Sequence, residues 1–91
     1  MDETPREAIQ ATHKVADKLD QHGHAHHAGA FRAVLAERHP GAMLLAALRE
    51  TCQTVLTAIE AIDPVCATLV EELRLEVDKR LTQEHSRATE A

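Results

Sequence analysis

A heptad repeat in the middle of the chain limits the possible folds more than any other part of the sequence. Apolar side chains recur at two heptad positions, three times each. They are Leu45, Cys52 and Ile59 at the first position and Leu48, Val55 and Ile62 at the second. Three uninterrupted repeats predict one long helix, over about residues 41–62, that packs against other helices along an apolar seam.

Two shorter helices are predicted before this one. The first has Thr4 as its N-cap and runs over about residues 5–21, with Gly23 ending it. The second covers about residues 25–38 and ends before Pro40, because a proline disfavours the helical conformation of the preceding residue. The alternative is a kinked helix that continues through Pro40 into the long helix.

The last helix starts at a clear N-terminal signal. Asp63 is a favourable N-cap, and Pro64 fits the first helical position. The apolar face of this helix consists of Cys66, Leu69, Val70, Leu73, Val77 and Leu81. From about residue 84 the chain loses its apolar residues, so we expect the helix to fray there.

Short connections make sequential helices antiparallel neighbours. We therefore predict a single all-α domain over residues 1–91, a small antiparallel four-helix bundle with up-down-up-down topology, in which the third and fourth helices are the longest. Residues 1–3 and 85–91 are expected to be frayed tails.

The unequal helix lengths also suggest a homodimer. At 1.5 Å per residue the third and fourth helices would be about 30–33 Å long and the second about 21 Å, so the shorter pair cannot cover the longer one. A second copy of the chain would cover the remainder. The expected interface residues are Leu45, Leu48, Val55, Leu56, Ile59, Leu73 and Val77.

Composition argues against several classes of partner. With 15 acidic and 10 basic residues the net charge is −5, which disfavours binding to nucleic-acid phosphates. Phe31 is the only aromatic residue, so stacking on bases is disfavoured as well. The two cysteines lack C-x-x-C spacing and are interpreted as reduced core residues, and no apolar run reaches about 18 residues. We therefore expect a cytoplasmic protein without a membrane or nucleic-acid partner.

Four of the seven histidines lie in one short stretch, "DQHGHAHHAG", at the expected turn between the first two helices. They are His22, His24, His26 and His27. In an antiparallel bundle this turn lies at the same end as the turn that holds Asp63, and Glu60, Asp17 and Asp20 are further potential neighbours. Imidazoles with carboxylates suit zinc, nickel or copper. Three interpretations remain open: a selected metal site, weak adventitious affinity for nickel or copper, and a plain polar turn.

Enzymatic motifs are not apparent. Ser86 is the only serine, the three glycines form no phosphate-binding loop, and Cys52 is expected to be buried, where a thiol is inert. We therefore predict that the protein is not an enzyme.

Two segments show a family resemblance. "AHHAGAF", residues 25–31, loosely resembles the phosphate-accepting motif of histidine-phosphotransfer bundles, although the basic residue after the histidine is missing and the spacing to the glycine is shorter. "CQTVLTAIEAI", residues 52–62, is similar to the ligand-bearing helix of the small copper-, nickel- and formaldehyde-sensing repressors, but Val77 and Leu81 stand where further ligands are expected.

The leading hypothesis is a small cytosolic interaction or regulatory protein that acts through protein–protein contacts, as a homodimer or with another protein. The alternative is a metal-binding or metal-responsive bundle that uses the histidine-rich turn at residues 22–27. A histidine-phosphotransfer-like module ranks third.

Overall fold

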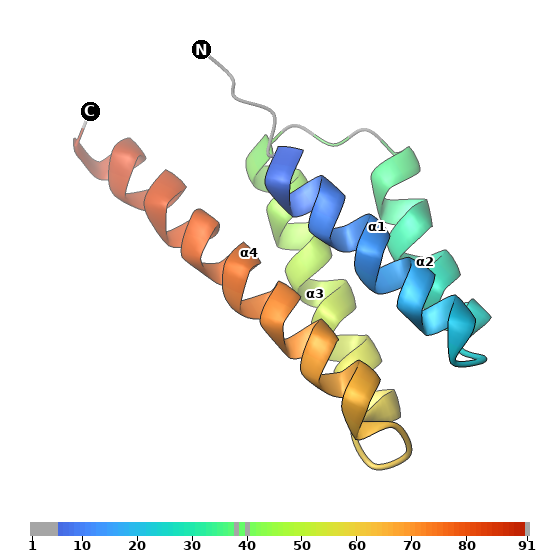
Figure 1. Ribbon diagram of the computed structural model, residues 1–91. Helices are drawn as coiled ribbons and strands as arrows, with labels where there is room; N and C mark the ends of the chain where they lie inside the picture. Colours follow the sequence, from blue (N-terminus) through green and yellow to red (C-terminus); the bar gives the residue numbers. More distant parts are fainter. Residues whose placement is uncertain (1–5, 38, 40, 91) are drawn as a thin grey trace.

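The structure is a computed structural model that describes residues 6–37, 39 and 41–90, with side chains as far as Gln83. Four helices account for nearly all of it (Figure 1), and the described residues contain no strand. The helices are α1 (Arg6–Gln21), α2 (Ala25–Ala36), α3 (Gly41–Ile59) and α4 (Pro64–Glu90). The predicted all-α four-helix fold is confirmed.

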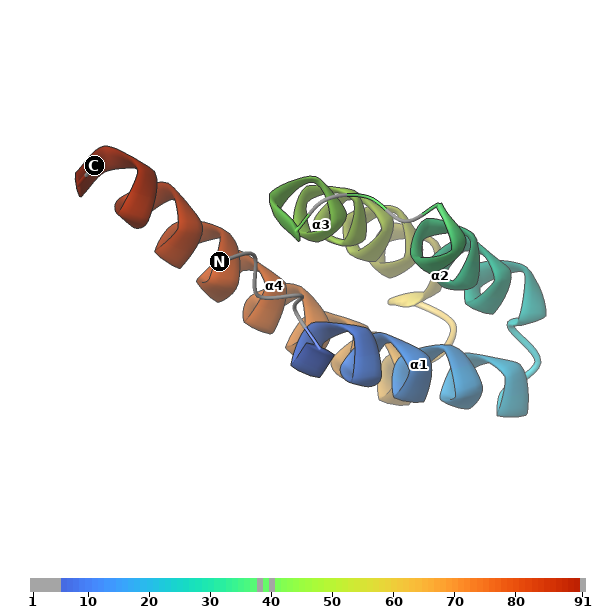
Figure 2. The ribbon, with the colours of Figure 1, turned by 90° about the horizontal axis from the view of Figure 1, so that it is seen from above.

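Successive helices run in opposite directions and form two hairpins (Figure 1). α3 packs most extensively on α4, and α1 packs on α2, while α1 also contacts α4 and α2 contacts α3. Seen from above, α1 and α2 lie as a pair beside α3 and α4, and the C-terminal part of α4 extends beyond the other helices (Figure 2). Both interhelical turns that join the members of a hairpin lie at the same end of the molecule.

The core consists of the apolar faces that helical spacing predicts. The largest fully buried apolar side chains are Phe31, Leu19, Leu48, Ile59, Val55, Val70 and Val77. Thr12 is fully buried among them, and its hydroxyl donates a hydrogen bond of 2.7 Å to the carbonyl oxygen of Ala8. A buried hydroxyl of this kind avoids the cost of an unpaired polar group.

The structure corrects the predicted end of the third helix. α3 ends at Ile59, not near Ile62, and the backbone N–H groups of Ile62 and Asp63 fold back to the carbonyl oxygen of Ile59 at 3.0 and 2.8 Å. Ile62 is consequently 70% exposed and does not continue the heptad seam. α4 runs from Pro64 to Glu90, and the predicted fraying from about residue 84 stays a prediction.

The alternative of one kinked helix through residue 40 is not what the structure shows. α2 ends at Ala36, α3 begins at Gly41, and His39 between them is not helical. The predicted cap at Thr4 and the tail at residues 1–3 lie outside the described residues, as do the side chains of the tail at residues 85–91.

The expected dimer-interface residues lie mostly inside the single chain. Leu45, Leu48, Val55, Ile59, Leu73 and Val77 are buried, and Leu56 is half-buried. Helices of the same chain already cover six of these seven side chains, so Leu56 is the one that keeps part of its surface exposed in the single chain.

Among the described helices, α3 has the length and apolar composition that could cross a membrane, although the core helix of a soluble protein meets the same criteria. In this structure its apolar face is packed against the rest of the bundle.

Candidate functional site

The α1–α2 turn is built around Gly23, which has a φ of +82°. The N–H of His24 donates to the carbonyl oxygen of Leu19 at 2.8 Å, and the N–H of Gly23 donates to that of Asp20 at 3.1 Å. This pair of bonds is the Schellman motif, in which a residue in the left-handed region closes a helix. The turn reverses the chain so quickly that His22 and His24, on either side of Gly23, both face the second hairpin.

The α3–α4 turn presents Asp63 as the N-cap of α4. Its Oδ1 accepts a hydrogen bond of 3.1 Å from the backbone N–H of Cys66, three residues into the "DPVC" sequence. This confirms the predicted cap, since an N-cap side chain satisfies one of the free N–H groups of the first turn. The other carboxylate oxygen, Oδ2, is left to face the first hairpin.

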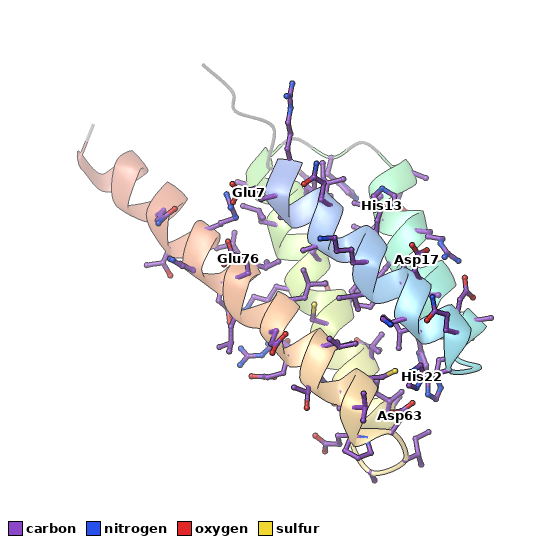
Figure 3. All side chains as sticks on the ribbon, viewed as in Figure 1. Glu7, His13, Asp17, His22, Asp63 and Glu76 are labelled. Atoms are coloured by element: carbon purple, nitrogen blue, oxygen red, sulfur yellow. The ribbon has the colours of Figure 1, made fainter. Side chains whose placement is uncertain are left out.

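The two turns meet at Asp63 Oδ2. His22 Nδ1 lies 3.1 Å and His24 Nε2 lies 2.9 Å from this oxygen. Figure 3 shows His22 and Asp63 together at one end of the bundle, with Glu7 at the opposite end. His24 and Asp63 are each largely covered, with side chains 16% exposed, whereas the His22 side chain is 37% exposed.

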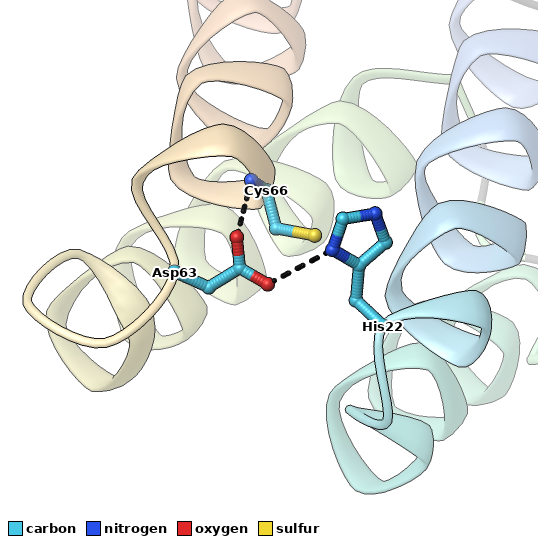
Figure 4. A group of neighbouring side chains, drawn as sticks. All are labelled: His22, Asp63 and Cys66. Atoms are coloured by element: carbon cyan, nitrogen blue, oxygen red, sulfur yellow. Dashed lines mark hydrogen bonds and ion pairs between the residues drawn. The ribbon is translucent and has the colours of Figure 1, made fainter.

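Cys66 completes the cluster (Figure 4). A ligand atom from each of His22, Asp63 and Cys66 lies within 4.8 Å of the other two. The Cys66 side chain is buried, with 1% of the residue exposed. The site therefore combines an accessible imidazole, a shared carboxylate and a buried thiol.

These contacts shift the pKa values of Asp63 and Cys66. The N–H of Cys66, followed by the hydrogen bonds of His24 and His22, holds the pKa of the Asp63 carboxyl well below its usual range. Burial, together with the neighbouring Asp63 carboxylate, raises the pKa of the Cys66 thiol to about 11. At neutral pH the cluster therefore contains an ionised carboxylate and a protonated thiol, which is a poor nucleophile.

Two of the four predicted histidine ligands are not part of this cluster. His26 and His27 lie on the first turn of α2, and their rings contact each other edge to face with centroids 5.6 Å apart. Burial and, to a lesser extent, the nearby His26 and His24 lower the pKa of His27. His22 and His24 thus face Asp63, His26 is exposed on α2, and the half-buried His27 lies between them, with its ring centroid 6.3 Å from that of His24.

Among the described side chains, most of the acidic residues predicted as neighbours of the histidines make other contacts or none. Asp17 and Asp20 pair with Arg32 of α2, within their own hairpin, at 3.1 and 2.5 Å. Glu60 lies in the α3–α4 turn and is exposed. Among the side chains of these four acids, in the described part of the chain, only that of Asp63 is hydrogen-bonded to histidines of the stretch.

The apolar spacing predicted Cys66 as a core residue, and Cys66 was not among the predicted ligands. In the structure Cys66 belongs both to the core and to the cluster around Asp63. A residue at the third position of a helix lies beside the N-cap, and its side chain can still point inward. The available signal was the spacing of "DPVC": an N-cap carboxylate and a thiol three residues apart share the first turn of α4.

Imidazole, carboxylate and thiolate donors are the ligands of tetrahedral zinc sites. With bonds of about 2.0–2.3 Å, the ligand atoms of such a site lie about 3.3–3.8 Å apart. The contacts to Asp63 Oδ2 are slightly shorter than this, and the 4.8 Å span of the whole group is wider. Side-chain movements of about 1 Å would bring the donors to zinc distances.

Comparison with known proteins adds no assignment. No protein-family model matches the sequence, and no curated protein or solved structure shows significant similarity to it. A functional proposal therefore depends on the chemistry of the two turns.

Proposed function

We propose that this protein is a metal-binding helical bundle that holds one zinc ion between its two turns. The observation that carries the proposal is the convergence of His22, Asp63 and Cys66 from distant parts of the chain. His24 Nε2 contacts the same carboxylate oxygen but is not part of the group that gathers within 4.8 Å, so its ring would have to move toward His22 and Cys66 to supply the fourth donor. The ligand set is then two imidazoles, one carboxylate and one thiolate.

The mixed donor set favours zinc over the other metals that the histidines alone would suit. Nickel and copper(II) bind well to imidazole clusters, whereas a thiolate in a tetrahedral set is typical of zinc. Binding requires neutral imidazoles with free lone pairs at His22 Nδ1 and His24 Nε2, and it displaces the proton of the Cys66 thiol. Asp63 needs no change, because its carboxylate is already ionised.

Metal content after equilibrium dialysis tests the proposal. The intact chain should retain one zinc ion per molecule, and Cys66→Ala should weaken binding by at least about 100-fold, because even contacts outside the ligand shell cost about 10–100-fold. Cys52→Ala is the matched control, since Cys52 is also buried but belongs to the α3 seam.

Cobalt provides a second readout of the same ligand. A cobalt–thiolate bond gives a charge-transfer absorption that should appear in the wild type and in Cys52→Ala and be lost in Cys66→Ala. Retention of the band in Cys66→Ala, or zinc binding that survives replacement of both His22 and Asp63, would contradict the proposed site.

We also propose a protein-contact role, as the composition and bundle fold first suggested. The supporting observation is that Ile62 and Val65, which flank the site residue Asp63, are 70% and 62% exposed. Ile62 lies in the α3–α4 turn and Val65 in the first turn of α4, and large apolar side chains exposed close together in the sequence favour contact with another protein. Light scattering at micromolar concentration distinguishes the possibilities: a dimer mass that Ile62→Ser with Val65→Ser reduces to one chain supports self-association through this turn.

A further inference from the structure

The bundle consists of two hairpins, and the pair of helices within each hairpin is packed more extensively than either pair of helices between the hairpins. Contacts of α3 with α4 and of α1 with α2 exceed those of α1 with α4 and of α2 with α3. Within the described side chains, polar contacts cross between the hairpins at two places. Arg80 of α4 pairs with Glu7 of α1 near one end, and Asp63 pairs with His22 and His24 at the other.

The ligands of the proposed site are divided equally between the hairpins. His22 and His24 belong to the α1–α2 turn, and Asp63 and Cys66 belong to the start of α4. His22 and Asp63 are 41 residues apart in the sequence, so only docking of the hairpins brings them together. We propose that the bound ion fastens the α1–α2 hairpin to the α3–α4 hairpin, so that its occupancy sets how often the two separate. This inference rests on the proposed zinc site.

The ion would affect separation because it binds the state with docked hairpins and not the state with separated hairpins. When the hairpins separate, each retains at most two of the four ligands, and its affinity for zinc falls. A ligand that binds only the docked state reduces the population of the separated state by a factor of about 1 + [L]/Kd. At a free zinc concentration of ten times Kd, separation should therefore become about tenfold rarer.

Hydrogen exchange of the intact chain measures this separation directly. The informative amides are those around the buried residues Leu19 of α1 and Phe31 of α2, compared with and without zinc at ten times its measured Kd. Amides that exchange through separation of the hairpins should slow by about tenfold. The variant His26→Gln should behave as the wild type, because His26 lies in the same histidine stretch but outside the cluster, whereas His22→Gln should lose the effect.

The outcomes separate this inference from the proposed function. If dialysis shows one zinc per chain but these exchange rates change less than twofold, the ion does not join the hairpins and the inference is wrong while the metal site stands. The same conclusion follows if zinc slows exchange equally in the wild type and in Asp63→Asn with Cys66→Ala, because the ion would then be held by the histidine turn alone. If the wild type retains no zinc, both proposals are wrong.

Discussion

Replacement of Gly23 by alanine tests whether the α1–α2 turn depends on a left-handed residue. An added Cβ at Gly23 would meet no atom within 4 Å, so the substitution creates no clash and its cost is confined to the backbone. An L-residue with a side chain pays about 1–2 kcal/mol in the left-handed region. The lower entropy of the unfolded chain offsets about 0.4–1 kcal/mol of this. We expect Gly23→Ala to reduce the free energy of unfolding by about 1 kcal/mol, the difference of these two terms.

Gly29→Ala is the matched control, because it changes the same atoms in the middle of α2. A Cβ at Gly29 also meets nothing within 4 Å, and this glycine is not at positive φ. Alanine in a helix interior is favoured over glycine by about 0.5–1 kcal/mol. The two variants should therefore shift stability in opposite directions.

Thermal unfolding followed by circular dichroism, in the presence of a chelator, measures both effects. For a domain of this size about 1 kcal/mol corresponds to about 4–8 °C, so Gly23→Ala should lower the midpoint by about that amount while Gly29→Ala raises it by about 2–8 °C. An unchanged or raised midpoint for Gly23→Ala would refute the assigned turn, and a lowered midpoint for Gly29→Ala would refute the placement of α2.

Four further outcomes are expected. Zinc affinity should rise about tenfold per pH unit between about pH 7 and 8, because the Cys66 thiol, with a pKa of about 11, must release its proton, and competition with a chelating dye should show this slope vanish in Cys66→Ala. Since the folded-state pKa of Asp63 is depressed, its carboxylate contributes stability at neutral pH that is lost as the pH falls below about 3.9 and through the folded-state value; urea unfolding should show Asp63→Asn less stable than the wild type at pH 7, with the difference shrinking in acid. Phe31→Ala, which empties the largest fully buried side-chain position, should cost about 3–5 kcal/mol in urea unfolding. Chelation of the metal should leave the far-ultraviolet circular dichroism of the chain helical, because Cys66 is the only proposed ligand in the apolar core and the other core side chains pack without the ion; a loss of helix on chelation would mean that the ion is required for folding.

Most helix ends were predictable because they depend on residues within a few positions of the end. Gly23 ends α1, and Asp63 with Pro64 starts α4, through interactions within a few positions. The end of α3 was not predictable in the same way. Ile62 matches the heptad as well as Ile59 does, so the heptad alone predicts that α3 continues to Ile62. Asp63 is the N-cap of α4 and is therefore not helical, and the turn that leads to Asp63 includes Ile62.

The candidate site was only half predictable, because its members depend on how the hairpins dock. The density of histidines identified the turn, and the antiparallel arrangement placed it near Asp63. Spacing within the stretch could not show that Gly23 turns His22 and His24 toward Asp63 while His26 and His27 begin a helix. Nor could apolar periodicity distinguish the interior of one chain from a dimer surface, since both bury the same side chains.

The division of roles within Asp63 explains how one residue can serve both the fold and a metal. Oδ1 caps α4 through the N–H of Cys66, and this contact lies within a single helical turn, independent of the first hairpin. Oδ2 accepts hydrogen bonds from both histidines. An ion would take the place of those two bonds and of the thiol proton while the cap remained intact. Metal binding at the proposed site would therefore exchange contacts on a bundle that is already folded.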